Sequence, residues 1–365
     1  MPNRTHNWYA ELKTKNSKLK TKTSQLSQMA NEEKRILIIR LSALGDVAMT
    51  VPAIYSLALR YPALKIDVVT RPFFARLFIN PPANVNVIGV DFKGEYKGVR
   101  GTLKLLKRLG KLKPDYVADL HNVLRSWIID NYFRLRGVKV EMVDKMRDKR
   151  RELFRTGEAQ PAFIDRYASV FARLGYPIEL TFKSLYENST PTLPFEPARP
   201  AIGIAPFARY FNKTYPAEML QEVISKLSAE GYHIYLFGGR GAEAEELQKW
   251  AAKAENCTSL AGTYPLEDEI ALMGAMNAMI SMDSSNQHMA ALAGTPVISI
   301  WGSTIPACGF MGYGQTADRA VYLDIPCQPC TVGGSPECPK GHFDCMRKLS
   351  PDIIVEKVRQ VTGKK

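Results

Sequence analysis

Short runs of aliphatic and β-branched residues alternate with longer amphipathic stretches through most of this chain. In the first half, runs with the length of buried parallel strands occupy 35–40, 65–70, 85–91, 115–120 and 138–143. Between them, apolar positions at helical spacing predict helices over 46–60, 99–112, 125–134 and 164–174. This alternation is typical of a doubly wound parallel sheet.

The same alternation restarts after a proline-rich segment, Glu187–Pro200, which can continue neither a helix nor a central strand. Beyond it the pattern predicts strands over 201–205, 232–237, 278–282 and 296–301. It predicts helices over 217–230, 242–254, 266–276, 286–293 and 351–361. Two α/β halves joined by such a linker place the expected active site in the cleft between them.

The pattern gives an N-terminal domain over 35–186, a linker over 187–200 and a C-terminal domain over 201–350. Residues 1–34 are polar with little periodic hydrophobicity, which predicts a disordered or loosely helical tail. The last helix, within 351–365, is expected to pack back on the N-terminal domain. No apolar run approaches the ~18–20 residues of a membrane span, and no signal-peptide core is evident, so we expect a cytoplasmic protein.

Lys and Arg outnumber Asp and Glu by 49 to 36, which gives a formal net charge of +13. Such an excess favours anionic partners: nucleic acid, membrane headgroups, or a phosphorylated or carboxylated substrate. The basic residues are scattered and no recognisable nucleic-acid motif occurs, so nucleic acid is not the expected partner. A peripheral contact with an anionic membrane remains open.

The segment Ser42-Ala-Leu-Gly-Asp46 directly follows the first predicted strand. In a doubly wound sheet this loop lies at the carboxyl edge, where ligands bind. Asp46 opens the next helix, and one interpretation is that it only caps that helix. The other is that its carboxylate faces the cleft and accepts a proton from a substrate hydroxyl.

The segment Met282-Asp-Ser-Ser-Asn-Gln-His288 is a second strand, turn and helix start. Hydroxyls and unpaired N–H groups at a helix N-terminus suit an anion such as a phosphate. The alternatives are that Asp283 is a plain helix cap and that His288 is an ordinary, fully hydrogen-bonded helix residue. The neighbouring strand 296–301 also ends in a small-residue loop, which favours a binding site.

Two further loops carry candidate donor-binding residues. Arg209 and Lys213 lie in the loop after strand 201–205, and either could be a solvated charge or a cation that neutralises a leaving diphosphate. Phe237-Gly-Gly-Arg-Gly-Ala-Glu243 is a glycine-rich turn into a helix, but it lacks the spacing of a dinucleotide-binding fingerprint.

Taken together, these segments resemble glycosyltransferase family 9, the ADP-heptose:lipopolysaccharide heptosyltransferases. The similarity covers about residues 35–362 and is strongest at 39–46, with Pro52-Ala53 downstream, and at 283–296. The resemblance implies a GT-B architecture of two Rossmann-like domains facing across a cleft. It also implies inverting transfer from a nucleotide sugar, expected to be ADP-heptose, to a lipopolysaccharide inner-core acceptor, with no cofactor for catalysis.

By motif match, Asp46 is the expected catalytic base and Lys213 the cation that meets the donor phosphates. Glu243 falls where an acidic residue contacts the nucleoside. The remaining residues expected to bind the donor are Arg209, Asp283, Ser284, Ser285 and His288. The family commonly has glycine where this chain has Ser285, and the added side chain would reshape the phosphate pocket.

The acceptor of this family carries carboxylates and phosphates and meets the N-terminal domain. Guanidinium groups suit such anions. The expected acceptor-binding residues are Ser42, Arg125 after strand 115–120, and Arg150 and Arg151 in the basic run 145–151. The alternative for the basic run is a solvated loop.

Four of the six cysteines, Cys327, Cys330, Cys338 and Cys345, form a cysteine-rich insertion over 327–345. Four thiolates are the number that a structural zinc site uses, although the second pair lacks a standard zinc-finger spacing. Structural zinc, reduced thiols and disulfides all remain open. Two competing functions also remain: a nucleotide-sugar epimerase, which shares the architecture, and a zinc-dependent nucleic-acid-binding module.

Overall fold

The apolar runs of the first half form one parallel five-stranded sheet. The computed structural model describes residues 33–363. Its strand order is β3-β2-β1-β4-β5, and every pairing is parallel. The strands are β1 (Arg35–Ile39), β2 (Lys65–Thr70), β3 (Val85–Gly89), β4 (Tyr116–Asp119) and β5 (Lys139–Met142). All five were predicted; the boundaries of β2 agree, and those of the other four differ by one or two residues.

Alternate residues of β1 serve the two faces of this sheet. Ile36 and Ile38 join the core beneath α3 and α8, whereas Leu37 and Ile39 join the core beneath α5 and α6. The helices of this domain are α2 (Leu44–Ala48), α3 (Val51–Arg60), α4 (Pro72–Ala75), α5 (Gly98–Gly110), α6 (Leu124–Arg134), α7 (Arg147–Thr156) and α8 (Phe163–Leu174).

One helical prediction and one alternative for this domain need correction. The helix expected over 46–60 is two helices, α2 and α3, and Pro52 stands in the first turn of α3, where its missing N–H costs nothing. The basic run continues into a helix, α7, rather than a solvated loop. α7 buries only Leu153, so its sequence lacks the apolar periodicity that would have indicated a helix.

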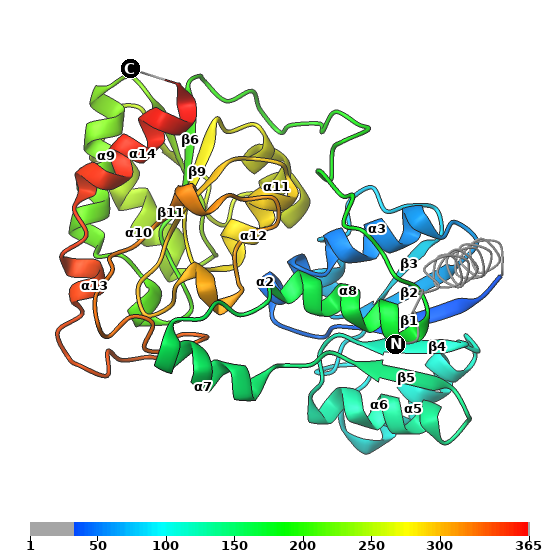
Figure 1. Ribbon diagram of the computed structural model, residues 1–365. Coiled ribbons are helices and arrows are strands. Elements are labelled where there is room, and N and C mark those ends of the chain that lie inside the picture. Colours follow the sequence, from blue (N-terminus) through cyan, green and yellow to red (C-terminus); the bar gives the residue numbers. More distant parts are fainter. Residues whose placement is uncertain (1–32, 364–365) are drawn as a thin grey trace, which may run out of the picture.

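The second half forms a six-stranded parallel sheet in the order β11-β10-β9-β6-β7-β8. Its strands are β6 (Ala201–Ala205), β7 (His233–Leu236), β8 (Cys257–Ser259), β9 (Ala278–Met282), β10 (Val297–Ile300) and β11 (Ala320–Val321). The two edge strands, β8 and β11, were not predicted because they are only three and two residues long. The doubly wound α/β fold expected for both halves is confirmed (Figure 1).

The helices of the second half are α9 (Ala217–Ala229), α10 (Ala242–Ala251), α11 (Leu266–Gly274), α12 (Ser285–Leu292), α13 (Asp344–Arg347) and α14 (Pro351–Thr362). The expectation that the last helix returns to the N-terminal domain is wrong. α14 lies beside α9 (Figure 1), where Arg359 pairs with Glu230 at 2.6 Å and Ile354 joins the C-terminal core. The predicted tail, up to residue 32, lies outside the described residues.

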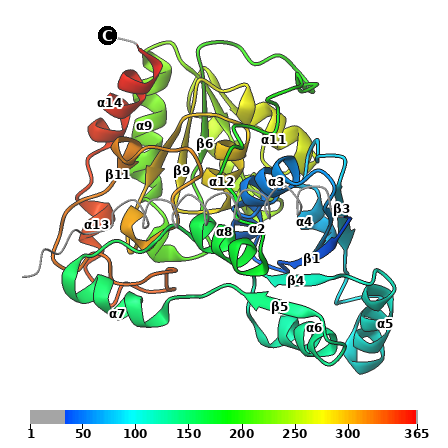
Figure 2. The ribbon, with the colours of Figure 1, turned by 45° about the vertical axis from the view of Figure 1, so that its right-hand side comes forward.

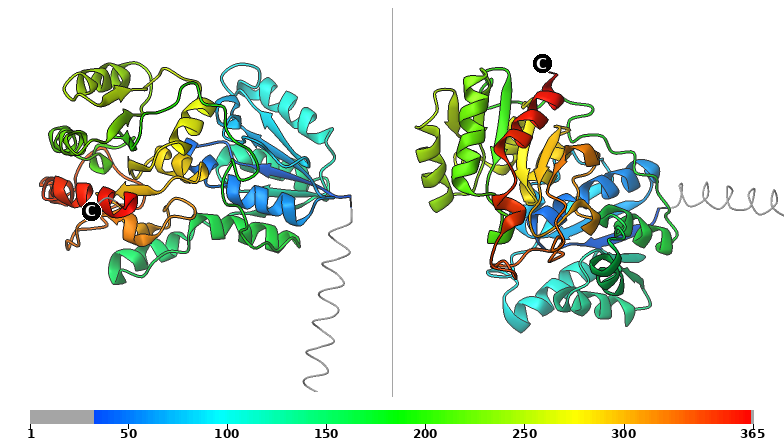
Figure 3. Two further views of the ribbon diagram at one scale, coloured as in Figure 1. Left: turned by 90° about the horizontal axis from the view of Figure 1, so that it is seen from above. Right: turned by 60° about the vertical axis from the view of Figure 1, so that its left-hand side comes forward.

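The two domains stand side by side (Figure 3) and meet where α2 packs against α12. Gly45 permits this contact, because a Cβ there would lie 3.0 Å from His288 Cδ2 and 3.2 Å from Ser285 Cα. A second contact follows α7, where Gln160 N donates to Ala307 O and Phe163 N to Gly309 O. No helix within residues 33–363 is long and apolar enough to cross a membrane.

Candidate functional site

A cavity of about 690 Å³ lies between the two domains, at the carboxyl ends of the central strands of both sheets. Its N-terminal wall consists of the segments after β1, β4 and β5 together with α7 and Phe163. Its C-terminal wall consists of the segments after β6 and β9, Phe310, and part of the cysteine-rich insertion. This is the position where open α/β sheets bind ligands. The cavity therefore brings the two motifs, 42–46 and 283–288, to one site.

Asp46 lies on the N-terminal wall in the first turn of α2. Its Oδ2 accepts a hydrogen bond from Ala43 N at 3.1 Å. Ala43, not Asp46, is the N-cap of α2, and Asp46 contributes to the cap from the third helical position. Its Oδ1 pairs with Arg40 Nη2 at 2.8 Å. The side chain keeps 27% of its surface exposed. The carboxylate is thus fixed in place and still accessible from the cavity.

Arg40, directly after β1, holds Asp46 from behind. It is buried, and its Nη1 donates to Leu120 O at 2.6 Å, while its Nε has no hydrogen-bond partner. Burial alone would lower the Arg40 pKa, but Tyr167 and Asp46 more than offset it, and the net pKa is raised. Asp46 therefore faces a permanent positive charge.

His121 follows β4 on the same wall. Its Nε2 lies 3.2 Å from Ser42 Oγ, and its buried Nδ1 has no partner. Burial, together with Arg40 and Lys145, lowers the His121 pKa to about 3. The ring is therefore neutral at physiological pH, and one of its nitrogens can accept a hydrogen bond from a substrate hydroxyl.

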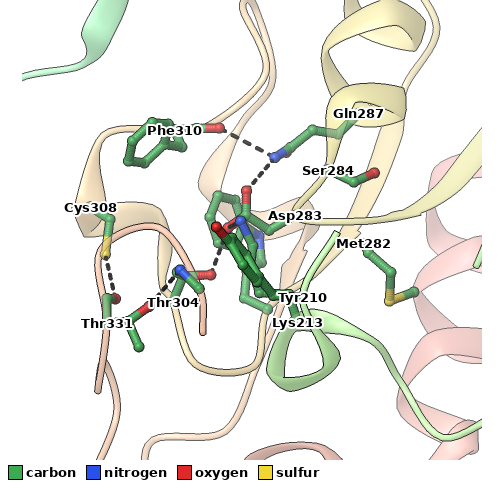
Figure 4. A network of polar contacts seen from close by, with 12 residues as sticks. Tyr210, Lys213, Met282, Asp283, Ser284, Gln287, Thr304, Cys308, Phe310 and Thr331 are labelled. Carbon is green, nitrogen blue, oxygen red and sulfur yellow. Dashed lines mark hydrogen bonds and ion pairs between the residues drawn. The ribbon is translucent and has the colours of Figure 1, made fainter. Parts of the chain in front are cut away.

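Asp283 lies on the C-terminal wall directly after β9, and its carboxylate is saturated (Figure 4). Oδ2 pairs with Lys213 Nζ at 2.6 Å and accepts from Thr304 Oγ1 at 2.6 Å, while Oδ1 accepts from Gln287 Nε2 at 2.9 Å. Only 4% of this side chain is exposed, against 13% for Lys213. Asp283 therefore fixes the Lys213 ammonium at the cavity wall.

Ser284 is the N-cap of α12, so Asp283 is not the helix cap. Ser284 Oγ accepts from Asn286 N, and the backbone of Ser284 is extended at φ −144°. Ser285, which stands where the family commonly has glycine, is the first residue of α12, and neither serine has a positive φ, so the serine pair introduces no backbone strain. Ser284 and Ser285 both line the cavity, which places hydroxyls and the positive end of the helix dipole there.

His288 lies one turn further along α12 and also lines the cavity. It is 6% exposed, and its Nδ1 has no hydrogen-bond partner among residues 33–363, which excludes the interpretation of a fully hydrogen-bonded helix histidine. Burial lowers its pKa to about 4, although Asp283 and Asp46 act in the opposite direction. The ring is neutral and leaves one nitrogen for a ligand.

The cavity is strongly cationic, with six Lys or Arg side chains against two carboxylates. The six are Arg40, Lys145, Arg147, Arg150, Arg209 and Lys213. Burial, Arg40 and Arg147 lower the Lys145 pKa, which reflects the crowding of positive charge on the N-terminal wall. A site of this kind attracts multiply charged anions such as a diphosphate or phosphorylated sugar.

Three of the expected site residues lie outside this cavity lining. Glu243 is exposed at the start of α10, where its Oε2 accepts from Gly239 N at 2.7 Å. Arg125 is exposed at the start of α6, with its guanidinium 4.5 Å from the centre of the Phe92 ring. Arg151 is exposed on α7, beside Arg150, which does line the cavity.

Several lining residues were not singled out from the sequence, among them Arg40, His121, Lys145 and Tyr210. Arg40 and His121 each come one or two residues after a strand, and that position was the available signal. Lys145 belongs to the basic run, in which only the later arginines were selected. Tyr210 adjoins Arg209 in the loop after β6, and nothing in the sequence marked it.

The four clustered cysteines are free thiols. Cys327 Sγ lies 3.9 Å from His342 Nε2, and burial together with the other three thiols raises the Cys345 pKa to about 12. Within residues 33–363, no group of three or more His, Cys, Asp or Glu is arranged to hold a metal ion, so these residues do not fit the zinc site. Asn212 anchors the insertion through Ser335, and Val332 and Gly333 reach the cavity wall.

Known proteins resemble this chain along most of its length. It is 26% identical over 314 residues to lipopolysaccharide heptosyltransferase 1 of Pseudomonas aeruginosa, covering 81% of this chain and 86% of that one. A glycosyltransferase family 9 structure from Veillonella parvula superposes with a TM-score of 0.69 at 18% identity, covering 92% and 98% of the two chains.

The E. coli heptosyltransferase WaaC with ADP-2-deoxy-2-fluoro heptose superposes with a TM-score of 0.63 at 20% identity, covering 89% and 99%. These two structures establish the shared fold. The family model described as glycosyltransferase family 9 (heptosyltransferase) matches residues 102–340, more than half of the chain. The chain therefore belongs to glycosyltransferase family 9 and is a glycosyltransferase.

Proposed function

We propose that the enzyme transfers a heptose from ADP-heptose to a lipopolysaccharide-type inner-core acceptor, with inversion at the anomeric carbon. The observation that carries this proposal is the single cavity in which Asp46 shares walls with Lys213 and the N-terminus of α12. The relative from Pseudomonas is a lipopolysaccharide heptosyltransferase, and the E. coli structure holds an ADP-heptose analogue. Both agree with this donor and acceptor.

In the proposed complex the donor diphosphate lies at Ser284 and Ser285 beside Lys213. The helix dipole and the Lys213 ammonium stabilise the negative charge that grows on the departing ADP. Arg209 and His288 complete the donor side. Glu243 meets the nucleoside in this proposal, which requires the α10 start to approach a bound nucleotide.

On the acceptor side, Asp46 accepts the proton of the attacking hydroxyl as its oxygen bonds to the anomeric carbon. The bond from that carbon to the diphosphate oxygen breaks, and ADP leaves from the opposite face. General-base assistance of this kind contributes about 10²–10⁴-fold. The rest comes from positioning, to which Ser42 and His121 contribute on the same wall.

Arg150, with Lys145 and Arg147, is placed to bind acceptor carboxylates and phosphates, and Arg125 and Arg151 extend this basic surface outside the cavity. We further propose that the enzyme acts in the cytoplasm. A lipid-linked acceptor adds a peripheral contact with the membrane face that displays it.

Product stereochemistry tests the proposal. Purified enzyme is incubated with a panel of ADP- and UDP-sugars and a delipidated inner-core acceptor, and the anomeric configuration of the product is read by NMR. We expect ADP-heptose to give the fastest transfer and the new glycosidic bond to have the configuration opposite to that in the donor. Retention of configuration, or faster transfer from a UDP-sugar, would contradict it.

A further inference from the structure

An unusual number of large apolar side chains is exposed on the outer side of α5 and α6. These two helices cover one face of the N-terminal sheet (Figure 2). The exposed fractions are 77% for Val99, 61% for Leu103, 74% for Leu124, 44% for Trp127, 43% for Ile128 and 87% for Leu135. We call these six residues the α5–α6 face. Clustered exposed apolar residues of this kind mark interaction sites in soluble proteins.

Helical spacing places the members of this face on continuous stripes. On α6, Leu124, Ile128 and Leu135 follow one another at intervals of four and seven residues, opposite the buried Ile129 and Phe133.

On α5, Val99 and Leu103 are four residues apart on the exposed side. The helices touch at Gly110, where a Cβ would clash with the Tyr132 hydroxyl. The two helices that carry the stripes therefore lie side by side.

The surroundings of this face are basic. From Lys97 to Lys113 the chain contains seven Lys or Arg and no acidic residue; these are Lys97, Arg100, Lys104, Lys107, Arg108, Lys111 and Lys113. On and just after α6, Arg125, Arg134 and Arg136 are exposed, and the one carboxylate of that helix, Asp130, is buried. Nearby acidic side chains are Asp91, Asp115 and Glu95, and Glu95 pairs with Lys104 at 2.9 Å.

Apolar side chains ringed by cations fit the interface of an anionic bilayer, where tryptophan is a favoured anchor and Lys and Arg meet headgroup phosphates. The same charges disfavour a symmetric dimer through this face, because a two-fold axis would bring two identical basic surfaces together. The face also adjoins the active site, since α6 begins directly after Val123, which lines the cavity.

We propose that the α5–α6 face docks the enzyme on an anionic phospholipid bilayer and so holds the acceptor wall of the cavity at the membrane surface. The purpose of this docking, which is access to a lipid-linked acceptor, rests on the proposed function. The docking itself rests on the exposed apolar stripes and their basic border.

Vesicle binding by the full chain tests the proposal. Co-sedimentation is measured with vesicles of phosphatidylcholine alone and of phosphatidylcholine with phosphatidylglycerol. We expect binding to the anionic vesicles, loss of that binding at high salt, and at least tenfold weaker binding to phosphatidylcholine. The double variant Leu124→Ser/Leu135→Ser should bind anionic vesicles at least tenfold more weakly. Lys107→Glu should weaken binding about fivefold or more.

The matched control is Leu59→Ser/Ile353→Ser, which removes two exposed apolar side chains on α3 and α14. It should bind vesicles as the wild type does. An equal loss in this control, or no binding of the wild type to anionic vesicles, would overturn the proposal. So would a lipid-free dimer that Leu124→Ser/Leu135→Ser disrupts, because the face would then be an interface between two copies.

Measurements of transfer activity distinguish a failure of this inference from a failure of the proposed function. The Leu124→Ser/Leu135→Ser variant should transfer normally to a water-soluble, delipidated acceptor and at least tenfold more slowly to an acceptor embedded in anionic vesicles. Equal loss on both acceptors would overturn the docking role. If the wild type transfers no heptose yet binds vesicles through these leucines, the proposed function fails and the membrane face stands.

Discussion

Two aspartates, one from each domain, lie at the carboxyl ends of the two parallel sheets and line the same cavity, but their surroundings differ. Asp283 is 4% exposed, and Lys213, Thr304 and Gln287 occupy its oxygens. Asp46 is 27% exposed and has Arg40 and one backbone N–H as partners. We propose that the same side chain serves as a fixed anchor on one wall, where the donor would bind, and as an accessible base on the other, where the acceptor would bind.

The two walls of the cavity also differ. On the acceptor wall, Arg40 Nε, His121 Nδ1 and Arg150 Nε are buried without hydrogen-bond partners, whereas the donor wall leaves His288 Nδ1 in that state. Since buried polar groups are normally paired, such atoms indicate where a ligand completes the structure. We therefore propose that the wall around Asp283 is already formed before the donor binds and that the acceptor completes the other wall.

The largest expected effect follows from the Asp46→Asn substitution. The amide keeps the shape of the side chain but cannot accept a proton, so kcat should fall by about 10²–10⁴-fold. Donor affinity should remain within about twofold. Single-turnover kinetics with ADP-heptose, combined with calorimetric donor binding, measure the two quantities. Turnover like that of the wild type would remove Asp46 as the base.

The Asp283→Ala substitution should mainly lower the free energy of unfolding. It leaves the Lys213 ammonium without its buried partner, and breaking such a pair costs about 3–5 kcal/mol of unfolding free energy. Denaturant unfolding measures the loss, and Asp46→Asn serves as the comparison and should lose much less. Equal losses for the two variants would erase the distinction between anchor and base.

Because His121 and His288 are neutral in the folded protein, we expect the stability of the protein to fall at acidic pH. His288 has a pKa of about 4 in the folded protein, below the ordinary 6.5, so the unfolded chain binds more protons between these values. Stability is therefore full above pH 6.5 and falls as the pH drops to 4, by about 3 kcal/mol from this residue at about 1.4 kcal/mol per pKa unit. His288→Gln should flatten that decline in pH-dependent unfolding. An unchanged pH dependence of the unfolding free energy would show that a group other than His288 takes up the proton.

Lys213→Ala should weaken donor binding by about 10–100-fold, the value of one charge-assisted hydrogen bond. Lys249→Ala, on the exposed side of α10, is the matched control. Calorimetry with ADP measures both. Unchanged affinity in Lys213→Ala would count against the phosphate contact.

The smallest expected effect concerns Glu243. If this carboxylate meets the nucleoside, Glu243→Ala should cost about 1 kcal/mol of donor affinity, or about fivefold. Because the carboxylate also accepts from Gly239 N, the stability of the variant must be measured alongside. Unchanged donor affinity would restrict Glu243 to stabilising the glycine-rich turn.

The fold and the meeting of the two motifs were predictable from the sequence because both depend on local rules. Strand-helix alternation determined the two sheets, and the carboxyl-edge rule placed Asp46 and Ser284 at one cleft. The family membership also decides against the nucleotide-sugar epimerase and the nucleic-acid-binding module.

Other features depend on contacts distant in sequence and could not be predicted. The saturation of Asp283 requires Lys213 and Thr304, which lie 70 and 21 positions away. The position of α14 depends on the surface of α9. The low pKa of His121 depends on its burial and on the charges of Arg40 and Lys145, which lie 81 and 24 positions away. The cysteine spacing indicated four possible metal ligands, but it could not show how these side chains are arranged in space.

The central claim is that one ligand spans Asp46 and the N-terminus of α12. A crystal structure of the enzyme with a non-transferable ADP-heptose analogue tests it most directly. We expect the diphosphate within hydrogen-bond distance of Lys213 Nζ and the Ser284–Ser285 turn, with the anomeric carbon facing the Asp46 carboxylate. A diphosphate bound away from α12, or a sugar turned from Asp46, would contradict the account.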